Sequence, residues 1–210
     1  MEEAPHERLC CYFVAVPGPM TGPGLPRVER LTTASACLID QLPADDTRFA
    51  TPQDALTACA PLPADARLYA LLVPVAHLPA ILADIHTGQA HEPVLLPRVT
   101  DPTPTGDDRA HALATTPGGR ELGWEVLGYD CGWLHSWLCN DLHHDAVRDL
   151  DIRTDARDLL PDHPTAARLA TWANTRTDTK PVTWFPASLI EWDIPAAYRS
   201  PPDPPSPQHR

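Results

Sequence analysis

Four side chains that could bind a metal or act as nucleophile or base recur every four residues, at Cys131, His135, Cys139 and His143. Asp130 can cap a helix that runs from there to about Leu150, and on that helix the four would share one face. Twelve helical residues span about 18 Å, whereas metal–ligand bonds are about 2.0–2.3 Å long. One ion cannot contact all four, so at best an adjacent pair, such as Cys139 and His143, could bind a metal together with ligands from elsewhere.

The same segment also suggests thiol chemistry. Cys131 would lie in the first turn of the helix, where the helix N-terminus lowers a thiol pKa, and His135 would follow one turn later as its base. A Cys131–His135 nucleophile is therefore the enzymatic interpretation of the segment. In the competing structural interpretation, Cys131 is a small core residue and His135 a hydrogen-bonded core histidine.

A third set of residues suits binding. Trp133 and Asn140 lie off the expected apolar stripe of the helix, and Asp130 at its start supplies a group able to titrate or coordinate. The stripe is formed by Leu134, Leu138, Leu142, Ala146 and Leu150. Tryptophan is enriched at binding hot spots. We therefore expect functional contacts at the strand–helix corner from Tyr129 to His144.

Common catalytic and cofactor motifs are missing. The chain has no GxGxxG, P-loop, GxSxG or HExxH pattern and no zinc-ribbon spacing. Their absence disfavours the usual phosphate-binding and hydrolase classes, and we expect no cofactor.

Charge limits the choice of partner. The net charge is −12, and no three basic residues occur in a row. Nucleic acid and anionic membranes are therefore disfavoured as ligands, because both need clustered Lys or Arg. The acidity suits a protein partner with a basic surface, although it would equally keep the chain soluble.

The N-terminal residues are acidic, unlike a signal peptide, and no apolar stretch approaches the length of a membrane span. We expect a cytoplasmic protein whose six cysteines are all reduced.

The first half predicts several short elements. Apolar runs closed by turn residues indicate buried strands at 9–16 and 67–75, and an edge strand at 94–99. Thr51 followed by Pro52 begins a helix that ends by Pro61, and 78–85 forms a second helix. The segment 31–42 is ordered as either strand or helix, and 100–109 is a long loop within one domain.

The second half is richer in signals. Residues 121–129 alternate as a half-buried strand, and a helix capped by Asp162 covers about 164–176. Residues 180–192 form an edge strand broken near Pro186. We predict a single α+β domain over 1–198, a mixed or antiparallel sheet with about four helices, and a disordered proline-rich tail over 199–210.

Residues 122–129 (LGWEVLGY) and 135–140 (HSWLCN) resemble a segment of uncharacterised small acidic proteins from high-GC Gram-positive bacteria, over roughly 120–195. In size, acidity and lack of motifs the chain is also similar in type to the immunity proteins that neutralise bacterial toxins. The resemblance implies no catalytic residue.

Three functions fit these observations. The first is a non-enzymatic protein-binding protein of accessory or immunity type. The second is an enzyme that uses thiol or metal chemistry in the 131–144 helix. The third is a small-molecule-binding domain with a pocket between the two halves.

Overall fold

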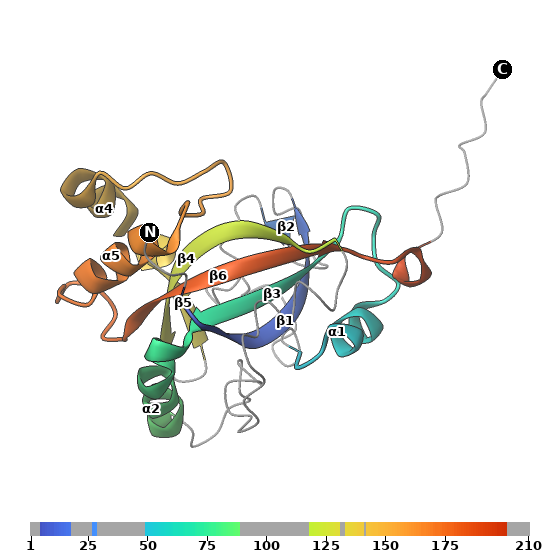
Figure 1. Ribbon diagram of the computed structural model, residues 1–210, viewed down its shortest axis with the longest axis horizontal. Helices are drawn as coiled ribbons and strands as arrows, with labels where there is room; N and C mark the ends of the chain where they lie inside the picture. The colour runs from blue at the N-terminus through green and yellow to red at the C-terminus, as the bar shows by residue number, and fades with distance from the viewer. Residues whose placement is uncertain are drawn as a thin grey trace.

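The computed structural model describes residues 5–17, 27–28, 49–88, 118–130, 133–140 and 142–200. Six strands join in one sheet: β1 (Glu7–Pro17), β2 (Arg27–Val28), β3 (Arg67–Pro74), β4 (Arg120–Asp130), β5 (Trp133–Ser136) and β6 (Trp184–Asp193). Their spatial order is β2-β1-β3-β6-β4-β5. Every pairing is antiparallel except that of β2 with β1, so the fold is an α+β domain around a curled antiparallel sheet (Figure 1).

Helices cover both faces of this sheet. The described α-helices are α1 (Pro52–Cys59), α2 (Leu78–Gly88), α4 (Leu142–Leu150) and α5 (His163–Ala173). One sheet face packs against α1 at one end and against α4 and α5 at the other, and we call it the α5 face. The opposite face packs against α2 and is called the α2 face. Alternate residues of each central strand therefore enter different apolar clusters.

The helix starts follow the capping signals in the sequence. The Thr51 side chain accepts a hydrogen bond from the Asp54 N–H, and Pro52 occupies the first turn of α1. Asp162 accepts in the same way from the Thr165 N–H and begins α5. Both predicted helices are confirmed, as are the strands that became β1 and β3.

The predicted helix from Asp130 to Leu150 is wrong in its first half. β5 turns back along β4, a 3₁₀ segment follows at Trp137–Asn140, and only α4 is α-helical. The apolar residues spaced by four do not form one stripe of a single helix. Leu134 packs on the α2 face of the sheet, whereas Leu142 and Ala146 of α4 pack on the α5 face. Pairing with β4 thus makes Trp133–Ser136 a strand, although the spacing of its apolar residues also fits a helix.

The segment 180–192 is neither broken nor at an edge. β6 runs without interruption between β3 and β4, and Pro186 pairs with Val126. β3 pairs with β6 only from Ser188 onward, so the Pro186 nitrogen can face the side where β6 has no strand partner. The missing N–H of proline is therefore tolerated in a central strand.

Burial also differs from the prediction for β4. Residues 123–129 are buried on both faces of the sheet, including Glu125, so the strand is not half-buried. At the other end, Arg199 forms a bridge with Leu62, and the Ser200 N–H donates to the Leu62 carbonyl at 2.8 Å. Arg199 and Ser200, which the prediction placed in the tail, thus contact the domain.

The segments predicted at 31–42, 94–99 and 100–109 lie outside the described residues. Among the helices that the structure describes, none combines the length and the apolar character needed to cross a membrane.

Candidate functional site

The predicted strand–helix corner is a β-hairpin. Asp130, the last residue of β4, pairs with Trp133, the first residue of β5. Cys131 falls between them and lies outside the described residues, as do the side chains of Asp130 and Trp133. The structure therefore leaves the predicted Cys131–His135 nucleophile and the binding roles of Asp130 and Trp133 as predictions.

His135 lies in β5 and is only 5% exposed. Its Nε2 is 3.3 Å from Nζ of Lys180, the only lysine in the sequence. A lysine ammonium can only donate, so a hydrogen bond between these two atoms needs the His135 tautomer whose Nε2 lone pair is free. This environment fits a hydrogen-bonded core histidine, the structural interpretation given above.

His135 belongs to a row of three residues across the sheet. It pairs with Gly128 of β4, which pairs in turn with Trp184 of β6. A side chain at Gly128 would collide with Val182, because a Cβ there would lie 2.3 Å from the Val182 Cγ2. The glycine thus leaves room for the side chains of Val182 and Trp184.

The two residues of the predicted metal pair, Cys139 and His143, lie in different elements. Cys139 and Asn140 lie in the 3₁₀ segment, and their side chains are outside the described residues. His143 lies in α4, with its ring 5.6 Å from that of Trp137. Among the described side chains, no group of three or more His, Cys, Asp or Glu is arranged to hold a metal ion.

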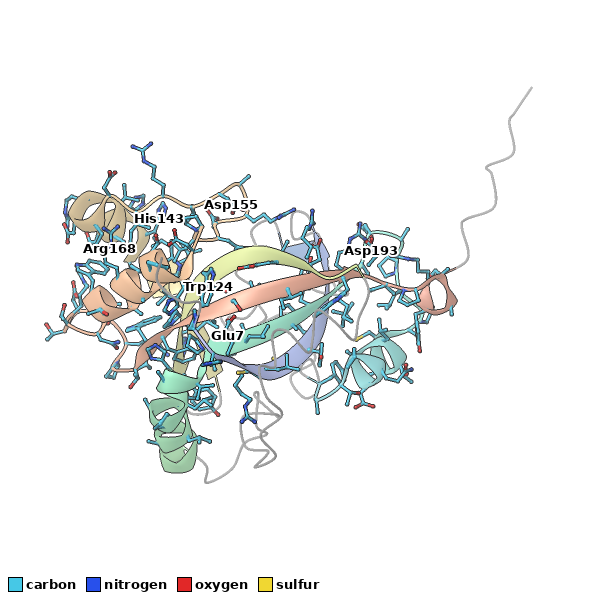
Figure 2. The ribbon with its side chains drawn as sticks, in the orientation of Figure 1. Glu7, Trp124, His143, Asp155, Arg168 and Asp193 are labelled. Atoms are coloured by element: carbon cyan, nitrogen blue, oxygen red, sulfur yellow. The ribbon has the colours of Figure 1, made fainter. Side chains whose placement is uncertain are left out.

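A polar surface not predicted from the sequence joins α4 to the end of α5. Its centre is Arg176, whose guanidinium contacts the carboxylates of Asp145 at 2.6 Å, Asp149 at 3.9 Å and Asp178. Arg148 adds an ion pair to Asp145 at 2.8 Å. We call these five residues, together with Trp172, the Arg176 surface (Figure 2 shows the side chains of α4 and α5).

An aromatic ring completes this surface. The Arg176 guanidinium lies 4.8 Å from the centre of the Trp172 ring, within the range of a cation–π contact. Its hydrogen bond to Asp178 lowers the pKa of that carboxyl, which therefore stays charged well below neutral pH. The result is a guanidinium fixed in place by several groups and surrounded by carboxylates.

Sequence reasoning missed this surface because its residues are spread over 145–178. Arg176 is at the last position of the predicted helix, and the predicted spacing gave no reason to pair it with α4. The signal present in the sequence was the spacing of four between Asp145 and Asp149, which places both carboxylates on the solvent-exposed face of α4.

Comparison of this chain with protein-family models, with curated proteins and with solved structures finds no match in any of the three. The functional argument therefore depends on the residues and their geometry.

Proposed function

We propose that this protein is a non-enzymatic binding protein of accessory or immunity type, whose partner is a protein with a basic surface. The observation that supports it is the Arg176 surface, where an arginine stacked on a tryptophan is held by carboxylates from α4 and from the segment that follows α5. Arginine and tryptophan are the residue types most enriched at binding hot spots.

Preorganisation favours binding at this surface. A free arginine loses rotamer freedom when a partner fixes it, and that loss weakens association. Here the contacts with Asp145 and Trp172 have already fixed Arg176, and its side chain is 18% exposed. Nearby on α4, Val147 is 41% exposed and offers an apolar contact.

The charge of the chain supports a basic partner. The net charge of −12 would accelerate the encounter with a positively charged protein, and salt would slow it. The enzymatic alternative has less support, since His135 is buried and already contacts Lys180. A cytoplasmic location in a bacterium remains part of this proposal.

The single lysine allows a direct test. An amine-reactive cross-linker can attach only at Lys180 and at the α-amino group, and Lys180 follows Asp178 of the Arg176 surface by two residues. We expect a cross-linked protein in cell extract to be joined through Lys180. The partner, once identified and purified, should bind with an affinity that falls as salt rises.

Variants of the Arg176 surface distinguish binding at this surface from attraction by the net negative charge of the chain. Arg176→Lys keeps the charge but loses the planar fork, and Trp172→Ala removes the stacking ring. Each should weaken binding of the purified partner at least tenfold, whereas Gln53→Ala, an exposed change on α1 at the other end of the sheet, should not. Equal binding by all four proteins would overturn the assignment to this surface.

A further inference from the structure

Lys180, the only lysine of the chain, lies against a buried histidine. Its Nζ is 3.3 Å from Nε2 of His135, although Lys180 itself is exposed in the segment between α5 and β6. A contact of this length places a proton acceptor beside an amine that solvent can reach. The pair therefore combines a nucleophile, a base and a route of access, which makes it a candidate site for covalent chemistry.

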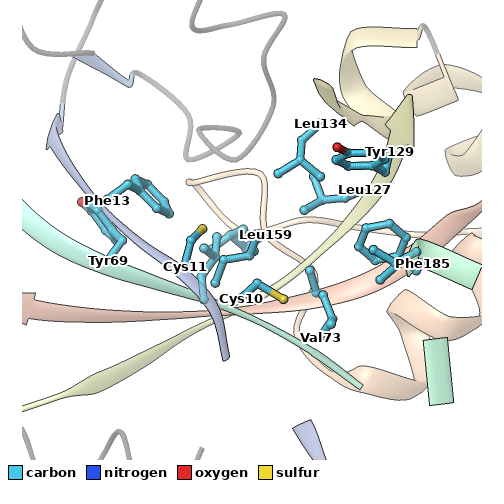
Figure 3. Packing of buried hydrophobic residues seen from close by; sticks show 14 residues of the cluster. Cys10, Cys11, Phe13, Tyr69, Val73, Leu127, Tyr129, Leu134, Leu159 and Phe185 are labelled. Atoms are coloured by element: carbon cyan, nitrogen blue, oxygen red, sulfur yellow. The ribbon is translucent and has the colours of Figure 1, made fainter. Parts of the chain in front are cut away.

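The sheet directs His135 toward this lysine. Its neighbour Leu134 packs on the α2 face, beside Leu127 and Tyr129 (Figure 3). Because successive side chains of a strand point to opposite faces, His135 points to the α5 face, where α4 and α5 also pack. The imidazole therefore lies on the side of the sheet that the chain crosses between α5 and β6.

The segment before β6 holds Lys180 in place above this part of the sheet. Val182 packs against the apolar cluster under α4 and α5, and its Cγ2 would lie 2.3 Å from a Cβ at Gly128, the strand partner of His135. The Val182 N–H donates to the Lys180 carbonyl at 2.8 Å, and the Thr179 hydroxyl donates to the same carbonyl at 3.3 Å. The backbone of Lys180 is thus fixed where its side chain reaches the imidazole.

We propose that Lys180 is a site of covalent carbonyl binding, where a small neutral aldehyde forms an imine with Nζ and His135 accepts the proton that the ammonium must lose. Lysine amines are almost fully protonated at neutral pH and are then poor nucleophiles. A histidine base suits neutral pH, and a positioned base of this kind accelerates a reaction by about 10²–10⁴-fold. The site does not depend on the proposed protein partner.

The reaction balances without a further reagent. Nζ gives one proton to Nε2 of His135, and the electron pair so freed attacks the carbonyl carbon. The π electrons of the carbonyl move to its oxygen, which takes the proton back from His135 and a second proton from the nitrogen. The C–O bond then breaks, water leaves with its electron pair, and Nζ is joined to carbon in a protonated imine. One positive charge is present before and after, so the product needs no new counter-ion.

Charge favours a neutral carbonyl compound over an anionic one. The chain carries a net charge of −12, and Asp178, two residues before Lys180, has a side chain that is 63% exposed. An anionic acyl donor or keto acid would approach against this negative field, whereas an uncharged aldehyde would not. The preferred electrophile is therefore small and uncharged.

Acetaldehyde with sodium cyanoborohydride is the direct probe, because hydride converts the imine into a stable amine that mass spectrometry locates. Nα-acetyllysine in the same solution gives the rate of a lysine without a neighbouring base. At pH 7, with cyanoborohydride in excess, we expect Lys180 to be alkylated at least about tenfold faster than this reference. The same protein in urea should lose the difference, because unfolding separates Lys180 from His135.

Variants identify the base. His135→Gln keeps an acceptor for the ammonium but cannot take up its proton, and should bring Lys180 close to the rate of the reference. His144→Gln, which replaces an exposed histidine of α4, is the matched control and should keep the full difference.

Three results would overturn the proposal. The first is an equal rate for Lys180 and Nα-acetyllysine in the folded, unaltered protein, a measurement that needs no variant. The second is an undiminished rate in His135→Gln. The third is a larger advantage over the reference with glyoxylate, an anionic aldehyde, than with acetaldehyde, which would contradict the choice of a neutral carbonyl compound.

Discussion

The side-chain amide of Asn174 takes the place of a neighbouring strand for Trp184. Its Oδ1 accepts from the Trp184 N–H and its Nδ2 donates to the Trp184 carbonyl, both at 2.8 Å. Asn174 is also the C-cap of α5, so one residue ends the helix and aligns the start of β6. The buried Trp184 ring then packs in the cluster under α4 and α5.

Asn174→Ala should therefore destabilise the domain. It leaves an N–H and a carbonyl of β6 without these two partners, at a cost of about 1–3 kcal/mol in the free energy of unfolding. Asn174→Asp keeps the acceptor but loses the donor, so its free energy of unfolding should lie between those of Asn174→Ala and the unaltered protein. Urea denaturation measures both; Thr175→Ala, which removes one exposed hydrogen bond to the Trp172 carbonyl, is the neighbouring control.

Gly128→Ala should also destabilise, through overpacking. The new Cβ would lie 2.3 Å from the Val182 Cγ2 and 3.3 Å from the Trp184 Cε3, so the core must shift, typically at about 1–3 kcal/mol. Val182→Ala removes the nearest atom, and the double variant should lose less stability than the two single changes added together. Strict additivity in urea denaturation would contradict the contact.

His77 should give the domain a dependence on acid. Burial lowers the pKa of its imidazole, and the nearby His163 lowers it further. The unfolded chain therefore binds a proton more readily than the folded one, and stability is lost as the pH falls below about 6.5, the ordinary histidine value. Between pH 7.5 and pH 5, His77→Gln should lose less melting temperature than the unaltered protein, and an identical loss would contradict this prediction.

Local signals in the sequence predicted much of the fold. Thr51 with Pro52, and Asp162 before α5, were recognisable because capping needs only neighbouring residues. The runs that form β1 and β3 were recognisable because a buried strand is apolar on both faces. β5 could not be recognised in this way, because its apolar residues also fit a helix and only pairing with β4 decides between the two.

The polar contacts depend on tertiary structure still more. Tyr69 and Glu191 are 122 positions apart and meet because β3 pairs with β6 in one particular register. Arg176 meets Asp145 because α4 packs beside α5. Neither pairing follows from local spacing, whereas His135 was noticed through its spacing and proved to be a buried residue beside Lys180.

The contacts of Arg199 near the C-terminus should contribute to stability. Arg199 donates through Nε to the Ile194 carbonyl at 3.0 Å and through Nη1 to the Pro63 carbonyl at 3.1 Å. Deleting 199–210 should therefore lower the free energy of unfolding by about 1–3 kcal/mol, since these carbonyls and that of Leu62 lose their donors. Deleting only 201–210 should change it little, because that segment contains no large apolar side chain to bury.

Urea denaturation of the two truncated proteins measures the difference. Equal stability would show that the Arg199 contacts contribute nothing, and a loss already present on removal of 201–210 would show that those residues pack against the domain.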